Sequence, residues 1–345
     1  MLHVSTEQAL HLRQELMRDA RRVVVKVGSQ LLTNIPGTTK QERIRLLVAE
    51  LALLREAGIE VILVTSGAIG AGMKLLGDQK RPTDLGSLQA RAAIGQSRLM
   101  SLYEQACQEH GFHCGQMLLS ADDVKDRKRH LNIRNCLSAL LSEGVLPIIN
   151  ENDTVSVEEI CFGDNDRLAA LVGTMVRADL VVLLTTINGL RERTEAGLGK
   201  RLSVVQGLTE AIRRMAKGTD GNPFSVGGMR TKLDAADITC TSGEYMWIVD
   251  GADFSVLRKV MSGEDIGTLF VPVSARISGN KRFLLFFTDP VGRILVDTGA
   301  ERALKTKGKS LLPSGITNVE GAFEKGDTVD IINPDGVVIG TGNPP

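Results

Sequence analysis

The chain has 345 residues, of which 43% are hydrophobic, and its 41 basic and 41 acidic residues give a formal net charge of zero. This balance excludes an overall positive field that would draw the chain to nucleic acid or to an anionic membrane, and the length suits about two domains. The longest apolar stretch, at 178–190, is shorter than the roughly 20 residues of a membrane span. The five cysteines are odd in number and lack metal-like spacing, so we expect reduced thiols in a cytoplasmic protein.

The first 20 residues carry charges throughout and are predicted to form an amphipathic helical extension. Over 21–270, apolar β-branched segments alternate with helical patterns. Strands are predicted at 21–28, 59–67, 145–153 and 179–186, with a short last strand at 245–251, and helices at 41–58, 88–110, 127–143 and from 163–171 onward. Near-continuous apolar strands separated by helices favour an α/β fold, with a mainly parallel open sheet sandwiched by helices.

The pattern changes at about residue 275. The segments "RFLLFF" (282–287), "RILVD" (293–297), "DTVDII" (327–332) and "VVIGTG" (337–342) are divided by turn residues and predict short strands. One short helix is predicted near 299–305. We therefore expect a small all-β C-terminal domain over 275–345.

Polar residues follow the predicted parallel strands. Lys26 ends the first strand, Ser66 begins the glycine-rich "SGAIGAG" after the second, "NEND" at 150–153 ends the third, and Thr185 and Thr186 end the fourth. Ligands of open parallel sheets bind beyond the carboxyl ends of the strands, so we expect these groups to converge on one edge.

Two lysines border glycine-rich loops. Lys26 precedes Gly28, and "KGTDGNPFSVGGMRTK" (217–232) opens a helix with Lys232 in its first turn. Two such cations suit phosphoryl transfer, in which catalysis is mostly positioning and stabilisation of spread negative charge. The alternatives are a strand-end lysine that reaches into solvent and a loop that is only a surface linker.

Three polar residues, Asp164, Asn165 and Asp166, precede the buried helical pattern of "RLAALV". One of them suffices to cap the helix, because one side-chain oxygen accepts a bond from the first turn. The others are predicted to face the site, where a carboxylate could orient the two lysines and the remaining groups could bind a substrate amino group. The alternative is that all three serve only the helix terminus.

The motifs "VVVKVGS", "VTSGAIGAG", "PIINENDTV", "FGDNDRLAALV" and "GGMRTKLDAADI" occur in an order and spacing that resemble the glutamate 5-kinases of the amino acid kinase family. The resemblance covers about residues 21–342. Its C-terminal part, "GKSLLPSGITNVEGAFEKGDTVDI", resembles a PUA domain. With the helical extension predicted at 1–20, the resemblance implies a kinase domain at 21–270 and a PUA-like domain at 275–345.

The resemblance implies ATP-dependent phosphorylation of the L-glutamate γ-carboxylate to γ-glutamyl phosphate, the first step of proline biosynthesis. It also implies Mg²⁺ on the phosphates, a homo-oligomer (dimer or tetramer) and feedback inhibition by L-proline. Two alternatives stay open: a kinase of another small carboxylate or of carbamate, and RNA binding through the PUA-like domain. The nine basic and eight acidic residues of 275–345 argue against the second.

By the same resemblance, Lys26 and Lys232 stabilise the transferring phosphoryl group and Asp166 organises them, while Ser66, Asp153 and Asn165 bind glutamate. No side chain is implied as a metal ligand. The residues implied at the nucleotide are Lys26, Thr185, Thr186, Val226, Gly227, Gly228, Met229, Arg230, Thr231 and Lys232. Two positions depart from the family pattern: Thr186 replaces an aspartate, and Val226 replaces a hydroxyl-bearing residue.

Overall fold

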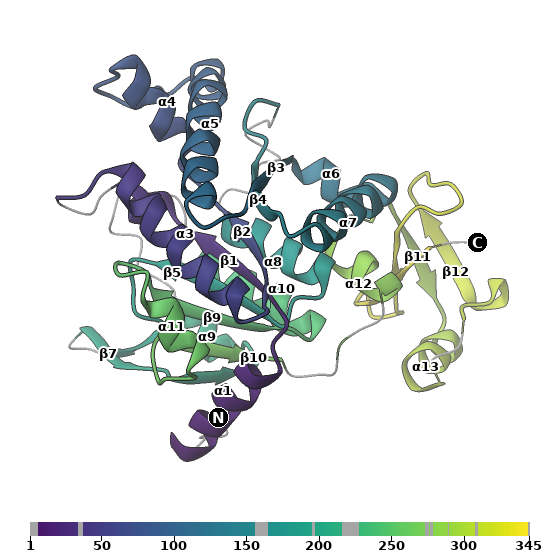
Figure 1. Cartoon of the computed structure of the whole chain (residues 1–345). Coiled ribbons are helices and arrows are strands. Elements are labelled where there is room, and N and C mark those ends of the chain that lie inside the picture. The colour runs from purple at the N-terminus through teal and green to yellow at the C-terminus, as the bar shows by residue number, and fades with distance from the viewer. Residues whose placement is uncertain are drawn as a thin grey trace. The chain divides into compact units, whose positions relative to one another are not determined.

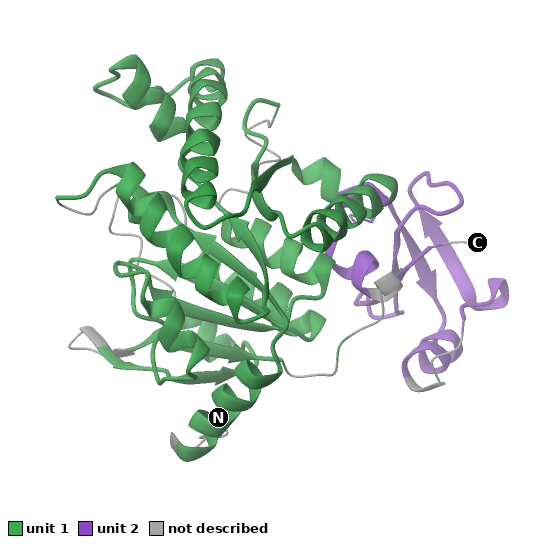
Figure 2. Ribbon diagram, in the orientation of Figure 1, with its two compact units in different colours: residues 1–124, 128–276 green, residues 125–127, 277–345 purple. Residues whose placement is uncertain are grey.

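The computed structural model describes residues 6–33, 37–155, 165–194, 197–215, 228–272, 276, 279–288, 290–307 and 310–343. The chain divides into two compact units, residues 1–124 with 128–276 and residues 125–127 with 277–345 (Figure 2). In the described ranges, no helix has both the length and the apolar character that crossing a membrane requires.

The first unit is built on an eight-stranded sheet of order β3-β4-β2-β1-β5-β9-β10-β8 (Figure 1). Only the β9–β10 pair is antiparallel, which confirms the prediction of a mainly parallel sheet. The prediction that 245–251 is the last strand of the series is wrong, because β10 follows it in the chain and pairs with β9. The strands are β1 Arg22–Val27, β2 Glu60–Val64, β3 Cys114–Leu119, β4 Leu146–Glu151, β5 Leu180–Thr185, β8 Val204–Gln206, β9 Tyr245–Asp250 and β10 Thr268–Val271.

Helices cover both faces of this sheet (Figure 1). The helices predicted at 41–58, 88–110 and 127–143 are confirmed as α3, α5 and α7. The helices of this unit are α1 Thr6–Asp19, α2 Ser29–Thr33, α3 Lys40–Glu56, α4 Ala68–Leu76, α5 Leu85–Gln108, α6 Ala121–Lys125, α7 Arg127–Ser142, α8 Asn165–Val176, α9 Glu210–Met215, α10 Met229–Ser242 and α11 Val256–Met261, and a small hairpin pairs β6 Arg191–Thr194 with β7 Gly197–Arg201.

Alternation along β1 decides which residues meet which helices. Val23, Val25 and Val27 belong to the core shared with α3 and α5. Lys26 has the opposite parity and therefore points to the face covered by α8 and α10. Every residue of α8 except Arg167 is buried, as expected for a helix that is enclosed on all sides. The start of α8 is thereby held firmly beside the end of β1.

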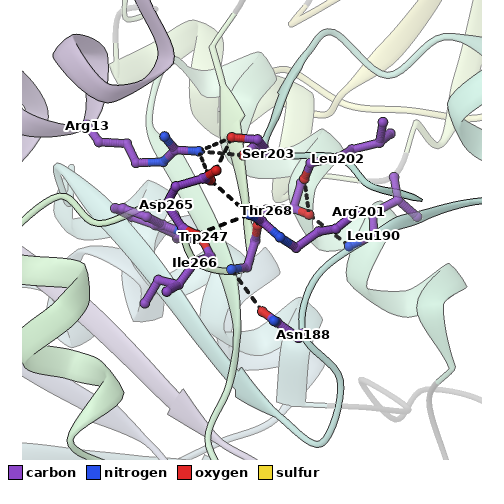
Figure 3. Close-up of polar contacts among 11 residues, drawn as sticks. Arg13, Asn188, Leu190, Arg201, Leu202, Ser203, Trp247, Asp265, Ile266 and Thr268 are labelled. Carbon is purple, nitrogen blue, oxygen red and sulfur yellow. Dashed lines mark hydrogen bonds and ion pairs between the residues drawn. The ribbon is translucent and has the colours of Figure 1, made fainter. Parts of the chain in front are cut away.

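The N-terminal helix α1 is anchored to the sheet by a buried arginine (Figure 3). The Arg13 side chain is 1% exposed, its Nη2 lies 2.8 Å from Asp265 Oδ1, and its guanidinium lies 5.7 Å from the ring centroid of Trp247. The same nitrogen donates to the carbonyl of Ser203 at 3.1 Å. The predicted helical extension is thus an integral part of the first unit at the β8–β10 edge.

Polar contacts continue from this edge to the loop that follows β5 (Figure 3). Thr268 Oγ1 donates to the carbonyl of Leu202 at 2.6 Å and accepts from the amide of Leu190 at 2.8 Å. Asn188 Oδ1 accepts from the amide of Gly267 at 2.9 Å. These contacts fix the loop at Asn188 and Leu190, directly after the predicted nucleotide-binding threonines Thr185 and Thr186.

The second unit contains a four-stranded sheet of order β12-β11-β13-β14. The predicted strands at 293–297, 327–332 and 337–342 and the predicted helix at 299–305 are confirmed, whereas β12 was missed. Its elements are α12 Gly279–Phe286, β11 Gly292–Val296, α13 Thr298–Lys307, β12 Ile316–Glu320, β13 Val329–Ile332 and β14 Val338–Gly342.

The predicted strand at 282–287 is wrong, because residues 282–286 lie in α12 and Phe287 directly follows the helix. The amide of Phe287 donates to the carbonyl of Phe283 at 3.0 Å, and the two rings lie 6.0 Å apart. Residues four apart share one face of a helix, and a run of six mostly apolar residues has no periodicity that separates helix from strand. The second unit therefore combines helices with its sheet and is not all-β.

Candidate active site

Two lysines from separate elements meet at one carboxylate. Lys26 Nζ of β1 lies 2.5 Å from Asp166 Oδ1, and Lys232 Nζ of α10 lies 2.9 Å from Asp166 Oδ2. Lys26 is 5% exposed, Asp166 0% and Lys232 6%. The structure therefore brings together the three residues that the sequence analysis placed at the phosphoryl group.

The electrostatics of this trio keep Asp166 ionised. Burial by itself would raise the pKa of Asp166, but the adjacent ammonium groups of Lys26 and Lys232 hold it well below its usual range. One carboxylate balances one of the two ammonium charges, so the trio retains a net positive charge. That charge is suited to an anionic ligand.

The start of α10 lies beside the trio. Thr231 Oγ1 donates to Asp166 Oδ2 at 3.3 Å and to the carbonyl of Gly228 at 3.0 Å, and Gly228 is the N-cap. Amides of a helix N-terminus favour phosphate oxygens. Met229 is buried and Arg230 is exposed. Val226 and Gly227, also expected at the nucleotide, lie outside the described residues.

The glycine-rich turn after β2 forms another wall. Gly67 is the N-cap of α4 with φ 98°, a left-handed conformation that favours glycine. At Gly95 of α5, a Cβ would lie 1.8 Å from the carbonyl oxygen of Ala68, so only glycine permits this approach of α4 to α5. The turn is thus fixed by packing and not only by its own sequence.

Asn165 joins this turn to the end of β4. Its Nδ2 lies within hydrogen-bond distance of three acceptors, Ser66 Oγ at 2.8 Å, Asn150 Oδ1 at 2.9 Å and the carbonyl of Thr65, among which its two N–H groups are shared. Asn165 and Asp166 therefore both make inward contacts, as predicted for the residues that do not cap α8. Asp164 lies outside the described residues.

Asp153 follows β4 and is half-buried. Burial and the nearby charge of Glu151 raise its pKa to about 6, although Arg81 opposes the shift. No hydrogen bond joins its carboxylate to another described residue. Thr185 ends β5, with its carbonyl accepting from Gly251 at 2.8 Å, and Thr186 is exposed.

Sequence reasoning missed two further polar groups near the site. Gln96 of α5 accepts from Asn150 Nδ2 at 2.9 Å, and Lys40 of α3 donates to the carbonyl of Gly67 at 2.9 Å. Burial, reinforced by Lys74, lowers the pKa of Lys40 to about 8. Each is a polar side chain within a helical pattern, and that pattern does not reveal which strand end the helix faces.

Comparison with known proteins agrees with this architecture. The model of the amino acid kinase family matches residues 21–250, and that of the PUA domain matches residues 292–343. The carbamate kinase from Giardia lamblia bound to AMP-PNP shares the fold, with a TM-score of 0.51 and 17% identity over 73% of this chain and 99% of that one.

Two relatives match nearly the whole chain. A glutamate 5-kinase of Trichlorobacter lovleyi is 45% identical over 333 residues, which cover 96% of this chain and 88% of that protein. A glutamate 5-kinase of Pelobacter propionicus is 44% identical over 329 residues, 94% and 87% of the respective chains. The resemblance seen in the motifs is confirmed: the chain belongs to the amino acid kinase family, and the relatives it matches along most of its length are glutamate 5-kinases.

Proposed function

We propose that the chain transfers the γ-phosphoryl group of ATP to the γ-carboxylate of L-glutamate, which yields ADP and γ-glutamyl phosphate. The observation that carries the proposal is the buried Asp166, whose two oxygens hold Lys26 at 2.5 Å and Lys232 at 2.9 Å. The name of the relatives, glutamate 5-kinase, supports glutamate as the acceptor. The family resemblance implies that this reaction is the first step of proline biosynthesis.

In this reaction a γ-carboxylate oxygen attacks the γ-phosphorus of ATP. The new C–O–P bond forms as the bond between phosphorus and the bridging oxygen of ADP breaks, and the electron pair leaves with ADP. The carboxylate is already ionised, so no protein base has to remove a proton. The net positive charge of the Lys26–Asp166–Lys232 trio stabilises the negative charge spread over the transferring group.

Glutamate is held by groups that complement its other end. The Asp153 carboxylate and the Asn165 side-chain oxygen accept from the substrate ammonium, and the Ser66 hydroxyl lies 2.8 Å from Asn165 Nδ2 at the same place. ATP lies along the start of α10 and the end of β5, near Gly228, Thr231 and Thr185.

Mg²⁺ enters with the nucleotide. Among the described residues, no three His, Cys, Asp or Glu side chains are grouped so that they could hold a metal ion. A Mg²⁺ that arrives with ATP would need few protein ligands, because phosphate oxygens and water would supply most of its coordination. When bound, the ion supplies charge neutralisation on the phosphates, while the chain's own lysines act on the transferred group.

We further propose a cytoplasmic homo-oligomer, dimer or tetramer, that L-proline inhibits by competing for the glutamate position. These properties follow from the family resemblance, and equilibrium sedimentation and inhibition assays test them.

The experiment that tests the function is ADP release with Mg²⁺, ATP and glutamate, in the presence of hydroxylamine to trap the acyl phosphate as a hydroxamate. Aspartate, N-acetylglutamate and carbamate replace glutamate as the acceptor in parallel reactions. Glutamate-dependent hydroxamate supports the proposal and shows that Thr186 and Val226 are tolerated. Turnover with another acid alone, or ADP release with none, would overturn it.

A further inference from the structure

Three buried amide side chains form a continuous hydrogen-bonded chain beside the candidate site. Asn165 Nδ2 donates to Asn150 Oδ1 at 2.9 Å, and Asn150 Nδ2 donates to Gln96 Oε1 at 2.9 Å. The three side chains come from α8, the end of β4 and α5, and they are 8%, 3% and 8% exposed. Each amide has a donor end and an acceptor end, so the direction of the chain matters.

Backbone groups fix that direction. Asn165 Nδ2 also faces the carbonyl of Thr65, which can only accept, so the amino group of Asn165 must point there. Asn150 Oδ1 also receives the backbone N–H of Glu151 at 2.9 Å, which can only donate. Asn150 therefore donates from its Nδ2 to Gln96, and Gln96 must accept this hydrogen bond through its Oε1.

The consequence lies at the two ends of the chain. Asn165 Oδ1 is left as an acceptor, and Gln96 Nε2 is left as a donor. Gln96 Nε2 is buried and has no hydrogen-bond partner among the residues that the structure describes. A buried donor without a partner is unfavourable, and a bound ligand that accepts from it would remove this cost.

We propose that Gln96 determines substrate specificity by donating a hydrogen bond from Nε2 to the α-carboxylate of the acceptor amino acid. The proposal rests on the proposed function and assigns the remaining group of the substrate. The γ-carboxylate must approach the phosphoryl group held by Lys26 and Lys232. The ammonium requires acceptors, which Asp153 and Asn165 Oδ1 supply. The α-carboxylate requires donors, and Gln96 Nε2 is a buried donor beside these acceptors that is unpaired among the described residues.

A glutamine that served packing alone would not need this arrangement. Its oxygen would satisfy Asn150, but its amino group would also find a protein partner or solvent. Here the backbone groups of Thr65 and Glu151 fix the orientation of the Asn165 and Asn150 amides. As a result, Gln96 Nε2 is placed where no described residue accepts its hydrogen bond. The site therefore recognises a hydrogen-bond acceptor on the ligand at this position, beside the groups that bind the ligand's ammonium.

The test compares Gln96→Glu with the wild type. A glutamate side chain keeps an oxygen for Asn150 Nδ2 and has nearly the same shape, but it replaces the free donor by an anionic oxygen. Gln105→Glu, at an exposed position of the same helix α5, is the matched control. Gln96→Leu removes both polar ends and gives a second variant, and thermal unfolding midpoints report whether each variant folds.

Three acceptor-site ligands separate the roles: glutamate, glutarate, which lacks the ammonium, and 4-aminobutyrate, which lacks the α-carboxylate. For Gln96→Glu we expect the KM of glutamate and the inhibition constant of glutarate to rise by about 30-fold or more, because a donor is exchanged for a like charge. The inhibition constant of 4-aminobutyrate and the KM of ATP should stay within about twofold of the wild type.

Equal weakening of all three ligands in the folded variants, or no weakening, would overturn the role of Gln96. A wild-type protein that forms no hydroxamate from glutamate would instead overturn the proposed function itself. A third outcome would overturn only the role of Gln96: the wild type forms hydroxamate from glutamate, and both Gln96 variants keep the wild-type relative affinities for glutamate, glutarate and 4-aminobutyrate.

Discussion

Lys26 and Lys232 donate to opposite oxygens of the same carboxylate, one from a strand and the other from the first turn of a helix. Because each ammonium uses part of its donor capacity on Asp166, both are held in place before any ligand arrives. Preorganised charge of this kind needs no rearrangement as the transition state forms.

Replacement of Lys232 by Met keeps the aliphatic stem and removes the ammonium. We expect Lys232→Met to lower kcat by about 100-fold or more, because one of the two cations at the transferring phosphoryl group is lost. The hydroxamate assay measures this, with circular dichroism to confirm the fold. Lys259→Met, at an exposed position of α11, should keep wild-type turnover; a kcat within threefold of wild type in Lys232→Met would contradict the assignment.

Asp166→Asn should lower both activity and stability. The substitution leaves two buried ammonium groups without their shared counter-charge, so we expect the free energy of unfolding at pH 7 to fall by about 3–5 kcal/mol. The folded pKa of Asp166 is depressed, so its stabilisation is present above the unfolded value of about 3.9 and is lost as pH falls below it.

Urea unfolding of wild type and Asp166→Asn at several pH values measures this difference. The difference in the free energy of unfolding between the two proteins should be constant from pH 6 to pH 8 and should decrease towards pH 3. If this difference does not change with pH down to pH 3, the charge of Asp166 contributes nothing to stability.

Asp153 should impose an acid limb on glutamate use. Burial and Glu151 raise its pKa to about 6, so the carboxylate loses its charge as pH falls through 6. Since only the ionised form attracts the substrate ammonium, kcat/KM for glutamate should fall below pH 6 while the KM of ATP changes little. Asp153→Asn should raise the glutamate KM and abolish this limb; a variant that retains the limb would assign it to another group.

Arg13 should matter for stability and not for chemistry. The guanidinium is 1% exposed and pairs with Asp265 at 2.8 Å, although the Asp265 side chain is 41% exposed. Arg13→Met should lower the free energy of unfolding by about 1–2 kcal/mol, because the buried hydrogen bonds from the guanidinium to Asp265 and to the Ser203 carbonyl are lost, whereas Asp265 keeps Arg201 as a partner. Arg18→Met on the exposed face of the same helix is the control, and denaturant midpoints measure both. If Arg13→Met had the same denaturant midpoint as the wild type and the Arg18→Met control, α1 would not be anchored by this contact.

Much of the fold followed from local pattern. The buried strands around Lys26, Ser66 and Thr185 and the helices between them were predicted from periodicity, because a parallel sheet covered on both faces produces near-continuous apolar strands. Where periodicity was absent the prediction failed. The segment 282–287 packs as α12, and β10 turns antiparallel beyond β9, which depends on pairing between distant segments.

The sequence by itself determined the class of chemistry: lysines beside glycine-rich loops, and a carboxylate at the start of a buried helix, at the ends of parallel strands. The sequence also suggested that Asp166 organises both lysines, and the structure shows that each of its oxygens holds one of them. Only the tertiary structure decided that Gln96 ends a hydrogen-bonded series of amides with a donor that is unpaired among the described residues. The reason is physical. Residue type and period are local properties, whereas the direction of a hydrogen-bonded chain depends on which backbone groups meet it across the fold.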